Sequence, residues 1–147
     1  MGIFFIGLLA GILDGAAASL LAWTLAKRPP AAVFRFVASG LYGPRAFNGR
    51  YMVPTGVALH MVIALAFTAA YFGLCTLWSW PLQHPAGAAV SYGTVVWVIM
   101  NLVVIPLSKT PPRPMPLWLK VINLVILIVA IGAPVAWGAR WYFKAYL

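Results

Sequence analysis

Acidic side chains are almost absent from this sequence. Asp14 is the one acid among 147 residues, against ten lysines and arginines, which gives a formal net charge of +9. Catalysis by a pair of carboxylates is therefore excluded, and general acid–base chemistry would rest on Asp14 and His60 alone. The sequence also has no phosphate-binding glycine loop, nucleophile elbow or zinc-protease motif. We predict that the protein is not an enzyme.

Cysteine and histidine are nearly as scarce. Cys75 is the single cysteine, so neither an intrachain disulfide nor a thiolate metal cluster can form. A haem held between helices usually needs two axial ligands. The two histidines, His60 within the second span and His84 on the outer side, are expected to be separated by most of the membrane. We predict no cofactor and no metal site.

Charged residues of any kind make up 7% of the chain, whereas 64% of its residues are hydrophobic. A soluble domain is about 25% charged and about 45–50% apolar, so this chain cannot supply a polar surface. Its cations flank apolar segments and do not form a stripe on a soluble face, so nucleic acid is not an expected partner. Anionic lipid headgroups are the expected counterpart of these charges.

Four apolar segments are long enough to cross a membrane, which takes about 20 helical residues. Prolines stand near several of their ends, where a missing N–H and a fixed φ are tolerated. The sequence therefore predicts an all-α integral membrane four-helix bundle, with a single membrane domain over residues 1–147. The predicted spans are residues 3–26, 55–78, 85–107 and 117–139.

A further apolar stretch lies between the first two spans. Residues 31–38 carry one cation, Arg35, and end shortly before Gly40. This pattern fits a short interfacial helix that lies in the membrane plane, and it also fits a plain loop. The sequence leaves both alternatives open.

Lysine and arginine concentrate on one side of the predicted bundle, in the loops after the first and third spans. The other side has only Arg140 and Lys144. The positive-inside rule places the basic side in the cytoplasm and both termini in the periplasm or its equivalent. The residues expected to contact anionic headgroups are Lys27, Arg28, Arg35, Arg45, Arg50, Lys109 and Arg113.

Asp14 lies near the middle of the first span, where a charge costs about 2.5–3.5 kcal/mol on insertion scales. Gly7, Gly11 and Gly15 recur every four residues on the same helix face. Small residues at this spacing let two helix backbones approach closely, so we expect Asp14 to face protein. The carboxyl is then either a proton or cation site, or a neutral group that hydrogen-bonds across helices.

Each predicted span also contributes one polar side chain at a similar depth. We predict that Ser19, His60, Asn101 and Asn123 form one hydrogen-bonded layer, with Asp14 roughly a turn deeper. The layer would serve either as packing between helices or as a polar pocket for a small ligand, a proton or a lipid headgroup.

A set of short motifs lies in the second and third spans and in the loop after them. It comprises Gly56, His60, Ala64 and Tyr71, followed by Asn101, Ile105-Pro106-Leu107 and Thr110-Pro111-Pro112. In these positions the chain resembles the YagU-like family of small bacterial inner-membrane proteins. The resemblance implies a bacterial inner-membrane location and brings no catalytic residue with it.

Two functions from different classes follow from these features. We predict a non-enzymatic accessory or structural subunit that packs against other membrane protein subunits of a larger complex, because the chain has tight helices and almost no soluble surface. The alternative is a small homo-oligomeric transporter or channel that uses Asp14 and the polar layer for protons or a small solute. Lipid binding through Arg35, Arg45 and Arg50 is a third possibility.

Overall fold

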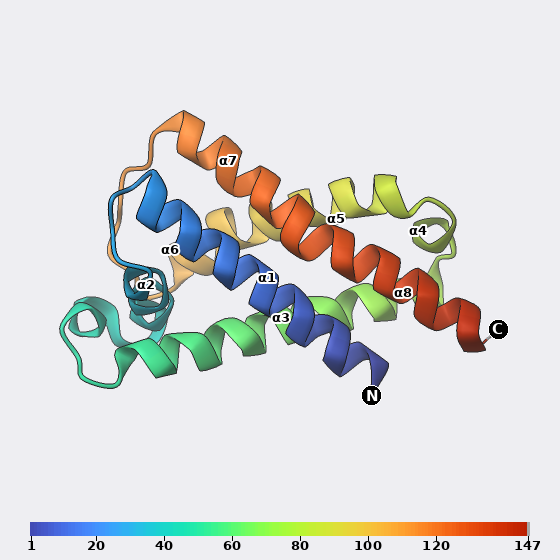
Figure 1. Cartoon of the computed structure of the whole chain (residues 1–147), viewed down its shortest axis with the longest axis horizontal. Coiled ribbons are helices and arrows are strands. Elements are labelled where there is room, and N and C mark those ends of the chain that lie inside the picture. The colour runs from blue at the N-terminus through green and yellow to red at the C-terminus, as the bar shows by residue number, and fades with distance from the viewer. Residues whose placement is uncertain (147) are drawn as a thin grey trace.

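The computed structural model describes residues 1–146, and of residue 146 only the backbone. The chain is 84% helical, with no strand in that range, which confirms the predicted all-α four-helix bundle (Figure 1). Four helical stretches are long and apolar enough to cross a membrane. Their bounds are Gly2–Thr24, Met52–Leu77, Pro85–Leu107 and Leu117–Ala145.

The first two stretches are single α-helices, α1 (Gly2–Thr24) and α3 (Met52–Leu77), whereas the last two each contain a π-helical turn. One such turn ends at Val104, two residues before Pro106, whose missing N–H cannot continue an ordinary helix ladder. The third stretch comprises α5 (Pro85–Ile99), η2 (Met100–Val104) and α6 (Ile105–Leu107). The fourth comprises α7 (Leu117–Leu127), η3 (Ile128–Gly132) and α8 (Ala133–Tyr146).

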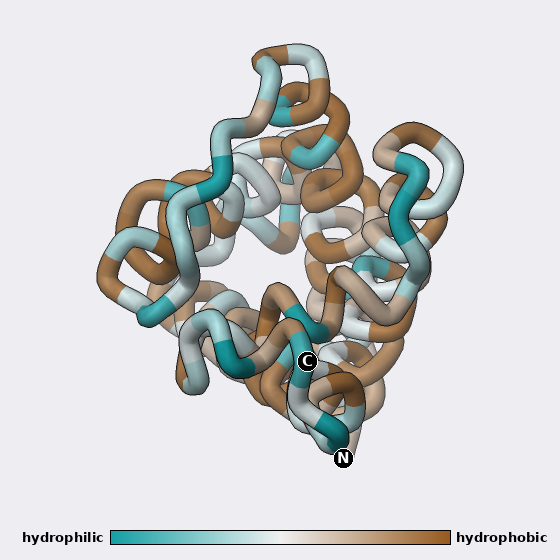
Figure 2. Tube along the Cα trace, turned by 90° about the vertical axis from the view of Figure 1, so that its left-hand side faces the viewer, coloured by the Kyte–Doolittle hydropathy of each residue, from teal (hydrophilic) through white to brown (hydrophobic). Residues whose placement is uncertain are grey.

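The segment between the first two spans folds as a helix, α2 (Ala31–Tyr42), followed by a 3-10 turn, η1 (Gly43–Phe47). Figure 1 shows α2 nearly end-on, so it runs across the ends of the long helices. Both termini lie toward the opposite end of the bundle, where the short helix α4 (Trp80–Gln83) contacts α8. Seen from the α2 end in Figure 2, the hydrophilic segments gather in the loops nearest the viewer.

Helix α2 is fixed to two other parts of this end. Gly56 of α3 lies so close to α2 that a Cβ there would stand 1.8 Å from the Phe34 carbonyl oxygen. On its other side, α2 receives a hydrogen bond from the Lys109 N–H to the Gly40 carbonyl at 3.0 Å. The Ser39 hydroxyl also donates to the Thr110 hydroxyl at 3.2 Å. Helix α2 therefore joins α3 to the loop that follows α6.

Glycines set the distance between α5 and the last span as well. A Cβ at Gly132 would lie 2.2 Å from the Ala89 carbonyl oxygen, and one at Gly93 would lie 2.6 Å from the Ile128 Cα. Aromatic rings, in contrast, join α3 to α5. Tyr92 donates a hydrogen bond from its hydroxyl to the Phe67 carbonyl at 2.5 Å.

The contact of α2 with α3 predicts opposite effects for two alanine substitutions in α3. Gly56→Ala is expected to lower the free energy of unfolding by at least about 1–3 kcal/mol, because a backbone carbonyl occupies the space of the new methyl group. Gly73→Ala is the matched control, since its Cβ would meet nothing within 4 Å and alanine favours a helix by about 1 kcal/mol. Unfolding by sodium dodecyl sulfate in mixed micelles measures both. Equal midpoints for the two variants would contradict the close contact.

Candidate functional site

The glycine face of α1 packs against α3. Gly7, Gly11 and Gly15 are all buried. A Cβ at Gly7 would lie 2.8 Å from Leu65, and one at Gly11 would lie 2.9 Å from the Met61 sulfur. Because these three positions of α1 carry no side chain, side chains of α3 reach the backbone of α1.

This close approach brings the only acid of the chain to a histidine. The Asp14 Oδ2 atom lies 3.8 Å from the His60 Nε2 atom. Their side chains are only 13% and 12% exposed, so the pair is largely shielded within the bundle. Two groups that can exchange protons thus stand together in an otherwise apolar interior.

The hydrogen bond of His60 defines its tautomer. Its Nε2 atom lies 2.9 Å from the Gly11 carbonyl oxygen. A carbonyl oxygen can only accept, so Nε2 carries the hydrogen and donates it. The other ring nitrogen, Nδ1, is then left to accept a proton. Gly15 makes room for the ring, since a Cβ there would stand 3.2 Å from Nε2.

Phe34 of α2 covers the pair at the α2 end of the bundle. Its ring meets the His60 ring edge to face, with 6.0 Å between centroids and 77° between planes. The tip of the Phe34 ring also lies 3.5 Å from the position of a Cβ on Gly15. An aromatic face also attracts a nearby cation, so Phe34 is placed to respond to a change of charge on His60.

The predicted layer of four mutually hydrogen-bonded side chains is not formed within residues 1–146. His60 bonds across helices, to Gly11, whereas Asn101 donates to the Trp97 carbonyl of its own helix at 2.9 Å. Neither Ser19 nor Asn123 makes a side-chain hydrogen bond in the described part of the chain. The physical reason is that distance along a helix predicts depth but not the direction in which a side chain points.

Two hydroxyl side chains of α5, in the same span as Asn101, also donate to carbonyls of their own helix. Ser91 donates to the Gly87 carbonyl at 2.8 Å, and Thr94 donates to the Val90 carbonyl at 2.7 Å. Hydroxyls that donate to a carbonyl of their own helix need no polar partner on a neighbouring helix. These residues therefore do not extend a polar cleft from the Asp14–His60 pair.

A column of polar side chains that sequence reasoning missed leads away from the pair along α3. Thr68 is fully buried and donates to the Ala64 carbonyl at 2.8 Å. Tyr71 is 1% exposed, and the centre of its ring lies 4.7 Å from that of Tyr92. Its buried hydroxyl makes no hydrogen bond of normal geometry within residues 1–146. The buried Cys75 thiol, a weak partner, lies beside that hydroxyl. The spacing of these residues from His60 puts them on one helix face. This spacing is the sequence feature from which the column could have been predicted.

Most of the basic residues expected at the headgroups lie at the α2 end, and several contact the protein as well. Arg35 donates from Nη1 to the Phe47 carbonyl, while its Nε is buried without a partner in residues 1–146. Arg50 lies 5.9 Å from the centre of the Tyr51 ring. Lys27, Arg28, Arg45 and Lys109 have exposed side chains.

The arrangement as a whole defines a class: a multi-pass α-helical membrane protein with one buried acid–histidine pair. Comparison with family models, curated proteins and solved structures finds no match to this chain. The resemblance to the YagU-like family therefore stays a prediction. Within residues 1–146, no group of three histidine, cysteine or acidic side chains is placed to hold a metal ion.

Proposed function

We propose that this protein binds and passes protons within the membrane, alone or together with a small solute, and that the Asp14–His60 pair is its proton-binding site. The observation that carries the proposal is the 3.8 Å separation of the only carboxyl of the chain from an imidazole in a shielded, apolar interior. A carboxyl without such a partner would be costly at this depth. The pair offers two basic positions, the Asp14 carboxylate and His60 Nδ1, for one arriving proton.

The surroundings of the pair support a gated route. Toward the α2 end, the Phe34 ring packs against the His60 ring, so a change of the Phe34 side-chain rotamer would open the pair to that side. Toward the other end, Thr68 and Tyr71 follow His60 on the same face of α3 and supply hydroxyls. Four helices enclose no wide pore, which favours protons over a large solute and suggests that several copies assemble.

The proposal includes an orientation. The α2 end carries most of the cations, so the positive-inside rule assigns it to the cytoplasm of a bacterial inner membrane. Both termini then face the periplasm. The proposed role needs no covalent step, because a proton binds to and leaves Asp14 and His60 reversibly.

Proton movement into proteoliposomes tests this function. With a potassium gradient and valinomycin to drive uptake, the wild type is expected to acidify a trapped pH dye faster than protein-free vesicles do. Asp14→Asn is expected to reduce the added rate at least about tenfold, because it removes the carboxyl that takes the proton. Thr94→Val is the control, since its hydroxyl bonds only to its own helix on α5.

Both variants must first elute as folded protein with wild-type helicity. A wild-type rate equal to that of protein-free vesicles would sink the proposal. So would an Asp14→Asn rate equal to that of the wild type.

A second candidate function, an accessory subunit of a larger membrane complex, is favoured by one surface of α3. Small side chains form an exposed stripe there, and a Cβ at Gly73 would meet nothing within 4 Å. Small-residue stripes of this kind pack against other helices. The stripe comprises Ala58, Val62, Ala66, Ala69 and Gly73.

Mass measurement after gentle extraction from native membranes separates the two functions. Multiples of the 15.9 kDa chain alone are expected if it assembles with itself to pass protons. A stoichiometric second polypeptide is expected if it is an accessory subunit. If α3 makes the contact, Ala66→Leu on the stripe should disrupt the complex with that polypeptide. A complex that stays intact in this variant would show that α3 is not the contact.

A further inference from the structure

The cations at the α2 end have no acidic partner within the protein. Asp14 is the one acid of the chain, and it faces His60 inside the bundle. Within residues 1–146, that contact is the one approach of a basic side chain to an acidic one within 4 Å. Any anion that neutralises the loops must therefore come from outside the chain.

Two of these cations, from loops far apart in the sequence, are gathered near each other. Arg113, in the loop before α7, lies 5.7 Å from the centre of the Phe36 ring on α2. The pKa of the Arg113 guanidinium is lowered, first by partial burial and then by the positive charge of Arg28, which follows α1. The fold thus holds two like charges close together, an arrangement that a bound anion would stabilise.

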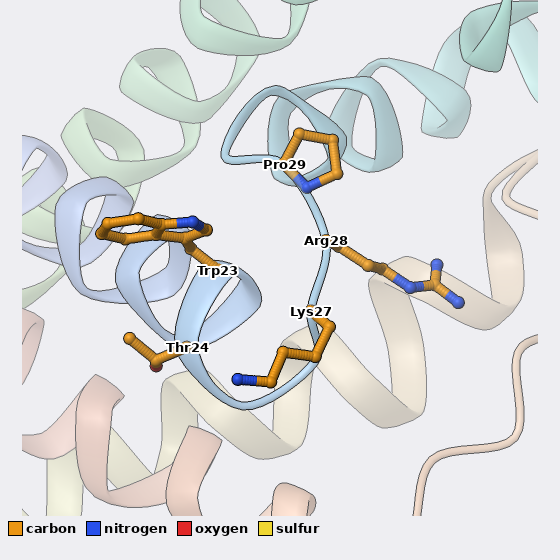
Figure 3. A pocket seen from close by; sticks show the side chains of 5 residues that line it. All are labelled: Trp23, Thr24, Lys27, Arg28 and Pro29. Atoms are coloured by element: carbon orange, nitrogen blue, oxygen red, sulfur yellow. The ribbon is translucent and has the colours of Figure 1, made fainter.

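Beside Arg28 the surface is hollowed. The hollow is open, has a volume of about 620 Å³ and lies where α1 ends (Figure 3). In Figure 3 the Lys27 ammonium group and the Arg28 guanidinium leave the loop in different directions, and the Trp23 ring lies across the turn from them. Its lining residues are Trp23, Thr24, Lys27, Arg28 and Pro29.

The backbone of Lys27 adds an independent observation. Its φ is +52°, and it is the one non-glycine residue with a positive φ in residues 1–146. The turn after α1 is closed by a hydrogen bond from the Arg28 N–H to the Ala22 carbonyl at 2.8 Å. Glycine is the usual residue at such a helix end, since a side chain strains this conformation. A lysine kept in a glycine position is explained if its ammonium group binds something.

The depth of the hollow indicates the ligand. Trp23 is 64% exposed, and tryptophan in a membrane protein prefers the level of the lipid headgroups. The charged residues beside the hollow, Lys27 and Arg28, carry N–H donors, which suit phosphate oxygens. We propose that Lys27, Arg28 and Arg113 bind the phosphate of an anionic membrane lipid at the turn between α1 and α2.

Titration of the delipidated protein with phosphatidylglycerol, followed by native mass spectrometry, tests this site. The wild type is expected to bind phosphatidylglycerol and to bind phosphatidylcholine of the same chain length far more weakly. The double variant Arg28→Gln/Arg113→Gln is expected to weaken phosphatidylglycerol binding roughly 10–30-fold, from the usual worth of a cation near an anionic surface. Lys144→Gln removes one charge at the other end and is expected to leave binding unchanged.

Lys27→Gly separates binding from folding. It is expected to raise the resistance of the protein to unfolding, because glycine relieves the strained φ, and to weaken phosphatidylglycerol binding about fivefold. Unchanged binding in both the double variant and Lys27→Gly would overturn the proposal. Equal affinity for inorganic phosphate would also overturn it, by identifying a soluble anion as the ligand. If Lys144→Gln weakened phosphatidylglycerol binding as much as Lys27→Gly does, the binding would be unspecific charge attraction and the proposed site would be wrong.

Discussion

The close approach of α1 to α3 is the contact on which the rest of this structure depends. Three glycines leave this face of α1 without side chains, so His60 of α3 reaches the Gly11 carbonyl at 2.9 Å and stands 3.8 Å from Asp14. The cost of a lone carboxyl inside a membrane is thereby offset by a partner on the neighbouring helix. The same contact lets Phe34 of α2 touch both His60 and the Gly15 position.

Helix α2 connects this interior pair with the basic surface. One of its sides is held against Gly56 of α3, and another is bonded to the loop after α6 through Gly40 and Ser39. Phe36 of the same helix lies under the Arg113 guanidinium. A change of charge at His60 and the binding of an anion at Arg113 would therefore act on one short helix, which gives the two proposed sites a common mechanical element.

The sequence predicted the membrane spans because apolar length and proline positions are local properties, and these need no tertiary information. The choice between a helix and a loop for residues 31–38 stayed open because it depends on tertiary contacts, such as the room that Gly56 leaves for Phe34. The predicted layer placed Asn101 and Asn123 together because they lie at a similar depth in the membrane. Depth does not give the direction in which a side chain points about its helix axis, and Asn101 donates to the Trp97 carbonyl of its own helix. Tyr71 and Thr68 were overlooked because aromatic and hydroxyl side chains in an apolar run look like ordinary membrane residues, although their spacing from His60 places them on its face.

Nitrogen NMR of labelled His60 in lipid bicelles tests the central contact most directly. The structure requires a hydrogen on Nε2, bonded to a carbonyl oxygen of α1, in either charge state of the ring. An Nε2–H resonance that is slow to exchange, and that shifts when Gly11 is replaced by alanine, is the expected result. A ring that carries its single hydrogen on Nδ1, or one in rapid exchange with water, would show that α1 and α3 do not meet in this way.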